Sequence, residues 1–188
     1  MLKANFITAQ EAAEKIQDGS TLCTIGMTLV SASESILKAI EKRFETVGHP
    51  ADITLVHSCG QSDRKDGIQH LAHEGLVKRI IGSHWGLQPR WMEMIANSQV
   101  EAYCLPQGQI AQLYRSMACG LPGKMSKVGL GTFIDPRVEG GKMNDRTKPL
   151  PDIVDILEYS GEEYMFYKEI PLDTVLIRGT VCDEMGNL

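Results

Sequence analysis

Hydrophobic residues follow two alternating patterns along the chain. Short apolar runs, which are typical of buried strands, occur at 22–25, 53–56, 80–81 and 100–105. Between these runs, apolar side chains recur at the spacing of one helix face, as at Ile110, Leu113, Tyr114 and Met117. Strands that alternate with helices predict a parallel sheet that is covered on both faces.

Capping signals predict where the helices begin. Thr8 followed by Glu11, and Ser31 followed by Glu34, have the spacing of a capping box. The first box predicts a helix that extends to about Gln17. The second predicts a helix whose apolar face carries Ile36, Leu37, Ile40 and Phe44. Further helices are predicted at 68–75, near 91–95 and from 110 to 120.

The last third of the chain has a different pattern. Residues 138–152 are polar and rich in Gly, Lys and Pro, which predicts a long surface loop. The segments 153–159 and 164–168 flank a Ser-Gly turn and predict an antiparallel hairpin, and 175–181 predicts a final strand. The whole pattern predicts an α/β fold: an open, mostly parallel sheet flanked by helices, with an antiparallel hairpin near the C-terminus.

Length and composition are those of a globular protein with a single domain. The 188 residues are 43% hydrophobic and 23% charged, with a formal net charge of −5. No basic stretch is dense enough to follow a phosphate backbone, so we expect no nucleic-acid partner. Gly186 and Asn187 have turn chemistry beside the last residue, and a turn normally returns to another element. We therefore expect residues 1–188 to be one domain and a fragment of a longer, two-domain chain.

The cysteines and the N-terminal residues indicate the cellular compartment of the protein. Five cysteines, an odd number without a CxxC pair, fit neither a disulfide scaffold nor a structural zinc site. Residues 1–11 contain no apolar signal core, and no apolar run has the length of a membrane span. We therefore expect reduced thiols in a cytoplasmic protein without a membrane partner.

Three groups of residues are candidates for chemistry. His70 and His73 could face a metal from one helix, but neither zinc-hydrolase order is present, so local hydrogen bonding is favoured and no metal site is expected. Gly129 and Gly131 lack the third glycine of a dinucleotide-binding loop, which leaves a tight packing turn and a ligand loop as equal alternatives. Gln107 follows a predicted strand, where parallel sheets bind ligands, and it could donate its amide to a ligand or merely cap the next helix.

Six segments share the sequences of one known family. They are Asp18-Gly19 with Gly26-Met27, 42–44 with its Phe44, 72–75, 106–108, 128–137, and 176–180 with 183–187. Together they resemble family I coenzyme A transferases, in particular the N-terminal half of the fused-chain type that includes acetate and propionate CoA-transferases. The resemblance covers essentially the whole chain, and its Gly-Thr-Phe-Ile-Asp-Pro-Arg stretch at 131–137 is specific. It implies the open α/β architecture that this family shares with ribose-phosphate isomerases.

The resemblance also implies an activity that this chain cannot complete alone. Family members transfer CoA from an acyl-CoA to a free carboxylate through covalent intermediates on a glutamate, and they need no cofactor besides the CoA thioester substrate. In the fused type that glutamate lies in the second half, in a Gly-x-Pro-Glu-like context that no glutamate here has. We therefore expect the isolated chain to be inactive. Its expected partners are an acyl-CoA, a short-chain carboxylate and the missing C-terminal domain, and we expect a homo-oligomer.

Two other functions are alternatives to half of an enzyme. One is a stand-alone, non-catalytic domain that binds acyl-CoA or another subunit. The other is a sugar-phosphate isomerase, which is weaker because no carboxylate–lysine pair is identifiable at matching positions.

The resemblance assigns roles to individual residues. By motif match, Gln107 corresponds to the family's oxyanion-hole glutamine, which would donate its amide to the charge that develops on the thioester oxygen. The residues expected in the substrate pocket are Gly26, Met27, Gly129, Gly131, Thr132 and Phe133. The chain departs from the family after Met27, where no Gly-x-Pro loop follows, so the shape of the acyl pocket is not defined by the resemblance.

Overall fold

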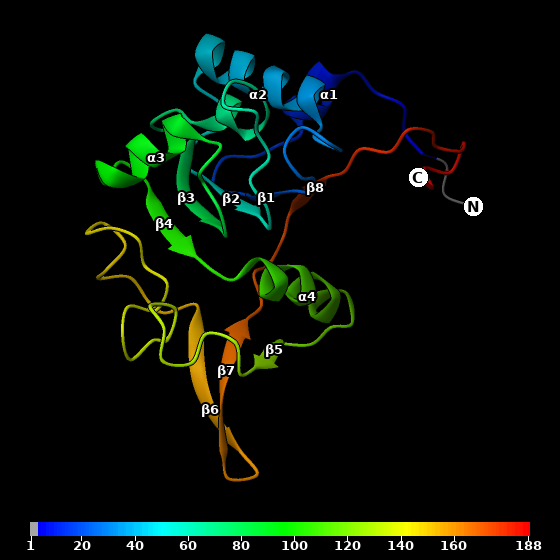
Figure 1. The fold of residues 1–188 in the computed structure, drawn as a ribbon. Helices are drawn as coiled ribbons and strands as arrows, with labels where there is room; N and C mark the ends of the chain where they lie inside the picture. Colours follow the sequence, from blue (N-terminus) through cyan, green and yellow to red (C-terminus); the bar gives the residue numbers. More distant parts are fainter. Residues whose placement is uncertain (1–3) are drawn as a thin grey trace.

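The computed structural model describes residues 4–188 and contains two β-sheets (Figure 1). The larger sheet has five parallel strands in the order β4-β3-β2-β1-β8: β1 Thr21–Thr24, β2 Ile53–His57, β3 Val77–Gly82, β4 Glu101–Cys104 and β8 Thr174–Leu176. The smaller sheet has three antiparallel strands in the order β5-β7-β6: β5 Gly123–Ser126, β6 Val154–Tyr159 and β7 Glu162–Lys168. The first three residues lie outside the described residues. They belong to the N-terminal segment in which the sequence shows no signal core.

The register of the parallel sheet explains its uninterrupted apolar runs. One row of aligned residues crosses the sheet on its first face: Leu22, Leu55, Ile80 and Ala102. The next row crosses it on the opposite face: Cys23, Val56, Ile81 and Tyr103. Because successive strand residues point to opposite faces and both faces are buried, the positions in these two rows are apolar. The predicted α/β fold class is confirmed.

Helices cover the first face, and the smaller sheet covers part of the second (Figure 1). The elements above the first face are α1 Ala9–Glu14, α2 Glu34–Val47, the 3₁₀-helix η1 Gly67–Leu71 and α3 Pro89–Ala96. The fourth helix, α4 Gln107–Ala118, packs with the smaller sheet below the second face, where Ile110 and Leu113 join a separate hydrophobic cluster. Two apolar clusters therefore hold one parallel sheet between them.

The two predicted capping boxes have different outcomes. The Thr8 hydroxyl accepts the Glu11 N–H (3.2 Å) and the Glu11 carboxylate accepts the Thr8 N–H (2.7 Å), so the first box is confirmed. The second box is wrong, because α2 begins only at Glu34 and Ser31 has a left-handed φ of 62°. The Glu34 carboxylate instead accepts the N–H of Gly67 (2.9 Å), from a loop distant in sequence.

Two other predicted elements are shorter than expected, and one strand is added. The helix expected at 68–75 is the shorter 3₁₀-helix η1, and the strand expected at 175–181 is the three-residue β8. The expected hairpin forms as β6 and β7, but β5 adds a third strand that the sequence did not predict. Gly123 in β5 allows this pairing. A Cβ there would lie 2.3 Å from the Tyr167 carbonyl oxygen, so the close approach of β7 requires a residue with no side chain.

The loop at 138–152 does more than cover the surface. It follows the outer edge of β4, where Ala102 N–H donates to Thr147 Oγ1 (2.8 Å) and Met143 N–H donates to Ala102 O (2.9 Å). The Asn144 amide donates to Val100 O (2.9 Å). Side chains and loop backbone therefore satisfy the edge strand in place of a sixth parallel neighbour.

Two further observations concern the thiols and the helices. All five cysteines lie within the described residues and are free thiols. Among residues 4–188, no helix combines the length and the apolar character that crossing a bilayer requires.

Candidate active site at the carboxyl edge of the parallel sheet

The four longer parallel strands end at the same edge of the sheet, so the segments that follow them lie side by side. Ligands bind at this edge in open parallel sheets. Three hydrogen bonds join neighbouring segments: Thr28 N–H to Gly60 O (3.1 Å), the Ser83 hydroxyl to Ser58 O, and Leu105 N–H to Gly82 O (2.9 Å). The carboxyl ends of β1 to β4 therefore form one continuous rim.

Gln107 lies at one end of this rim, as the first residue of α4. The N-cap of α4 is Pro106, so Gln107 occupies the first helical turn rather than the capping position. Its side chain is exposed. The structure thus places the amide on the surface at the carboxyl edge, where a ligand can reach it.

The loop at 129–133 is held by a buried carboxylate that follows it. Asp135, only 1% exposed, accepts the Gly131 N–H (2.9 Å), and the Thr132 hydroxyl donates to Gly129 O (2.8 Å). The Arg137 guanidinium holds the pKa of Asp135 well below its usual range by donating to both carboxylate oxygens. The specific stretch at 131–137 therefore encodes a rigid loop with an internal ion pair.

The two glycines of this loop serve different purposes. Gly129 has a φ of +100°, and a Cβ there would lie 2.6 Å from the Tyr167 hydroxyl oxygen. Gly131 has a φ of +69° but open space around its Cβ position, and it is exposed. A tight packing turn therefore accounts for Gly129, whereas Gly131 leaves room beside the backbone.

The structure connects this loop to the strand that precedes Gln107. Gly141 N–H donates to Phe133 O (2.9 Å), and Cys104 N–H donates to Gly141 O (2.7 Å). Cys104 is the last residue of β4, three positions before Gln107. The Phe133 side chain is 41% exposed. The loop at 129–133 and the segment that contains Gln107 are separate in the sequence, and both therefore lie at the same end of β4.

Gly26 and Met27 occupy the other end of the rim. They follow β1, which is separated from β4 by three strand spacings, roughly 14 Å. A Cβ on Gly26 would lie 2.8 Å from Val30 O, and Met27 and Val30 exchange both backbone hydrogen bonds (3.0 and 2.9 Å). The structure therefore does not bring Gly26 and Met27 against Gln107, and the Met27 side chain is 60% exposed beside this tight turn.

The middle of the rim contains residues that the sequence analysis missed. A Cβ on Gly60 would lie 2.6 Å from Gln88 Nε2 and 2.7 Å from His84 Nδ1, so glycine allows both side chains to approach the end of β2. Gln88 is fully buried, and neither of its amide atoms has a hydrogen-bond partner among the described residues. His84 is exposed between these groups. The available signal was Gly60, three residues after β2, because no motif contains these residues.

His57 is a buried neutral group beneath the rim. Burial lowers the pKa of His57 to about 4. Its Nδ1 lies 2.9 Å from Cys59 O, which can only accept, so Nδ1 carries the proton and Nε2 is an acceptor. Gly82 gives this ring its space, because a Cβ there would lie 2.4 Å from His57 Nε2.

An apolar groove lies on the α4 side of the parallel sheet. It has a volume of about 530 Å³ and is lined by Cys23, Ile25, Tyr114, Met117, Leu172 and Val175, among others. Burial raises the pKa of both the Cys23 thiol and the Tyr114 hydroxyl, so both groups are neutral near pH 7. Of the candidate segments only the one after β1 reaches it, through Ile25. The groove can receive an apolar group, and Glu169 is an acidic residue of its lining.

Comparison with known proteins identifies the family of the chain. The model of the coenzyme A transferase family matches residues 6–188. The chain belongs to the coenzyme A transferase family.

Individual CoA-transferases agree with this assignment. The chain is 43% identical over 186 residues to caffeate CoA-transferase of Acetobacterium woodii, covering 98% of this chain and 35% of that protein. It is 25% identical over 187 residues to acetate CoA-transferase subunit alpha of Escherichia coli (strain K12), covering 100% of this chain and 75% of that subunit. The crystal structure of the acyl-CoA transferase YdiF apoenzyme from Escherichia coli O157:H7 matches with a TM-score of 0.92 at 35% identity, covering 97% of this chain and 36% of that one.

These matches confirm the family and the architecture that the sequence predicts. They also show that the chain spans about a third of the length of caffeate CoA-transferase and of YdiF. The roles expected for Gln107, for Gly26 and Met27, and for the loop at 129–133 stay predictions.

Proposed function

We propose that the chain is the N-terminal part of an acyl-CoA:carboxylate CoA-transferase that acts on short-chain acyl-CoA substrates. The observation that carries this proposal is the joint placement of Gln107 and the 129–133 loop at the end of β4, in a chain so similar to CoA-transferases. In this proposal Gln107 is the oxyanion donor. Gly26, Met27, Gly129, Gly131, Thr132 and Phe133 contribute to the substrate pocket.

The proposed reaction needs only substrates and a glutamate nucleophile. The glutamate attacks the thioester carbonyl, the C–S bond breaks, and CoA leaves as a thiolate from an acyl-glutamyl anhydride. The thiolate then attacks the glutamyl carbonyl, which releases the first carboxylate and leaves a glutamyl-CoA thioester. The same two steps in reverse transfer CoA to the acceptor carboxylate. Each attack places negative charge on a carbonyl oxygen, and the neutral Gln107 amide can donate to it without pairing with the nucleophile.

The nucleophile would come from a C-terminal domain or a partner subunit. The similarity to a named alpha subunit supports the second arrangement, and the similarity to the much longer YdiF supports the first. The outer edge of β8 also favours further association, because β8 lies at the end of the sheet and Val175 within it and Ile177 after it are 42% and 57% exposed. A homo-oligomer of the complete enzyme, in the cytoplasm, is part of the proposal.

An exchange assay tests this division of labour. The purified chain is mixed with acetyl-CoA and excess propionate, and propionyl-CoA is followed by chromatography. We expect no exchange above the uncatalysed rate until the segment that carries the Gly-x-Pro-Glu glutamate is supplied. Exchange by the chain alone would contradict the missing nucleophile. A complete assembly that exchanges none of acetyl-, propionyl- and butyryl-CoA would contradict the transferase function and favour a binding domain.

A further inference from the structure

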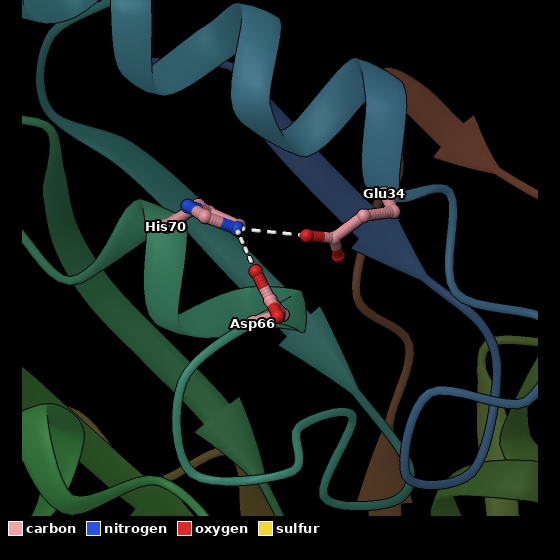
Figure 2. Close-up of side chains that lie close together, drawn as sticks. All are labelled: Glu34, Asp66 and His70. Atoms are coloured by element: carbon pink, nitrogen blue, oxygen red, sulfur yellow. Dashed lines mark hydrogen bonds and ion pairs between the residues drawn. The ribbon is translucent and has the colours of Figure 1, made fainter.

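A cluster of charged side chains joins the start of α2 to η1 (Figure 2). Glu34 begins α2, Asp66 immediately precedes η1, and His70 lies within it. His70 Nε2 lies 2.9 Å from Glu34 Oε1 and 3.3 Å from Asp66 Oδ1, and the three donor atoms all lie within 4.8 Å of one another. Glu34, more than thirty positions before the other two residues, thus joins Asp66 and His70 in pointing one nitrogen and two oxygens at a common centre.

The spacing of these donors suits a small divalent ion. Zinc binds imidazole nitrogen and carboxylate oxygen at about 2.0–2.2 Å in tetrahedral sites, which places neighbouring donors roughly 3.3 Å apart. The two measured separations from His70 Nε2 are close to that value. The remaining pair of donors, Glu34 Oε1 and Asp66 Oδ1, lies within 4.8 Å, and a tetrahedral ion held by three side chains would leave a fourth position for water.

The other side of the His70 ring has the support that metal-binding histidines have. His70 Nδ1 contacts the Glu41 carboxylate, and the His70 side chain is only 12% exposed. A carboxylate on the second imidazole nitrogen fixes the ring and makes the first nitrogen a better ligand. His73, which the sequence pairs with His70, contacts the other oxygen of Glu41 (2.9 Å) and stays outside the donor set.

A tethered cation already lies between the two carboxylates. Lys38 Nζ is 3.0 Å from Glu34 Oε1 and 3.2 Å from Asp66 Oδ1, the same two oxygens that face His70. The Lys38 side chain is 53% exposed and can swing away into water. A cavity of about 170 Å³, lined by Glu34, Lys38, Asp66 and Arg178 among others, gives access from outside.

We propose that Glu34, Asp66 and His70 bind one divalent transition-metal ion of the zinc type, with Glu41 positioning His70 and Lys38 replacing the ion in its absence. This site departs from the sequence-based expectation that the chain holds no metal. It does not depend on the proposed transferase function. The bound ion would link α2 to the loop that runs from the rim segment at Gly60 to η1.

Metal titration of the purified chain tests the proposal without any activity assay. After treatment with a chelator and its removal, Zn²⁺ binding is measured by calorimetry and Co²⁺ binding by visible absorption. We expect one equivalent to bind, a tetrahedral cobalt spectrum without a sulfur-to-cobalt charge-transfer band, and a higher Tm. No saturable binding would overturn the site, and so would a thiolate band, because the ion would then sit on cysteines.

Four variants separate a metal site from a plain ion-pair network. His70→Gln should abolish binding, and Glu41→Gln should weaken it about 10–100-fold, the usual effect of losing the group behind a ligating histidine. Lys38→Met should strengthen binding, because it removes the competing ammonium. His49→Gln, an exposed histidine paired with Asp18, is the matched control and should change nothing. Circular dichroism of each metal-free variant verifies folding; if Lys38→Met, whose side chain is exposed, folds but binds no better, the proposal is wrong.

Discussion

The carboxylate of Asp135 and the guanidinium of Arg137, two residues later, form a two-bond ion pair, with Nε to Oδ1 at 3.0 Å and Nη2 to Oδ2 at 2.8 Å. Arg137 also reaches the exposed Glu163 on β7 (2.9 Å), so the pair ties the 129–133 loop to the smaller sheet. The carboxylate is buried while the guanidinium is half exposed. Loss of the Asp135 charge therefore affects more than one contact.

We predict that Asp135→Asn destabilises the chain by about 1–3 kcal/mol, the cost of removing a charged partner from buried hydrogen bonds. Urea unfolding followed by circular dichroism measures this loss. Asp145→Asn is the control, because Asp145 is an exposed residue that pairs with Lys148 on the surface, and its loss should change stability little. Equal effects of the two substitutions would contradict the structural role of Asp135.

The same carboxylate predicts a pH dependence. Because the folded pKa of Asp135 is lowered, its contribution is complete above the unfolded value of about 3.9 and is lost as the pH falls towards the folded value. The stability difference between the wild type and Asp135→Asn should thus be constant from about pH 5 to 7 and shrink below about pH 4. A difference that instead disappears near neutral pH would show that another group is responsible.

Gln107→Ala in the complete enzyme should lower kcat about 100-fold, the usual effect of removing one oxyanion donor. Its Tm should stay unchanged, because the side chain is exposed and Pro106, not Gln107, occupies the N-cap position. Gln112→Ala is a matched control, since Gln112 is also an exposed glutamine of α4. An unchanged kcat with a lowered Tm would make Gln107 a structural residue.

Alanine substitutions at Gly129 and Gly131 should distinguish the cost of a steric clash from the cost of backbone strain. Gly131→Ala should cost about 1–2 kcal/mol, the strain of a left-handed backbone, since a Cβ meets nothing there. Gly129→Ala should cost clearly more, because the new methyl group would also collide with the Tyr167 hydroxyl, which donates to Val128 O (2.7 Å). Denaturant unfolding of both variants tests the order, and a larger loss for Gly131→Ala would contradict it.

His57 should titrate far below an ordinary histidine. Its pKa of about 4 lies below the unfolded value of about 6.5, so the unfolded chain binds the additional proton first. This group therefore reduces stability as the pH falls from about 6.5 to 4 and has no such effect above that range. NMR of the imidazole resonances measures the titration directly. A midpoint near 6.5 would mean that water reaches the ring.

The sequence alone determined the class of sheet, the family and most of the helices. These rest on local information: apolar runs and helical periodicities report burial within a few residues, as in α4 with Ile110 and Leu113. The specific stretch at 131–137 likewise needs no distant partner to be recognised, because Asp135 and Arg137 bond within it. The family assignment followed from residues that lie next to one another in the chain.

Only the tertiary structure decided the features that depend on distant partners. The sequence of β5 shows little apolar pattern, and its strand exists because β7 pairs with it. The Glu34 carboxylate bonds to the N–H of Gly67, in a distant loop, and does not complete the predicted capping box with Ser31. The sequence could not predict the carboxylate partners of His70 either, because Glu34 and Glu41 lie about thirty positions away. Hydrogen bonds and ion pairs between remote segments leave no periodic trace in a sequence, because their geometry exists only once the chain has folded.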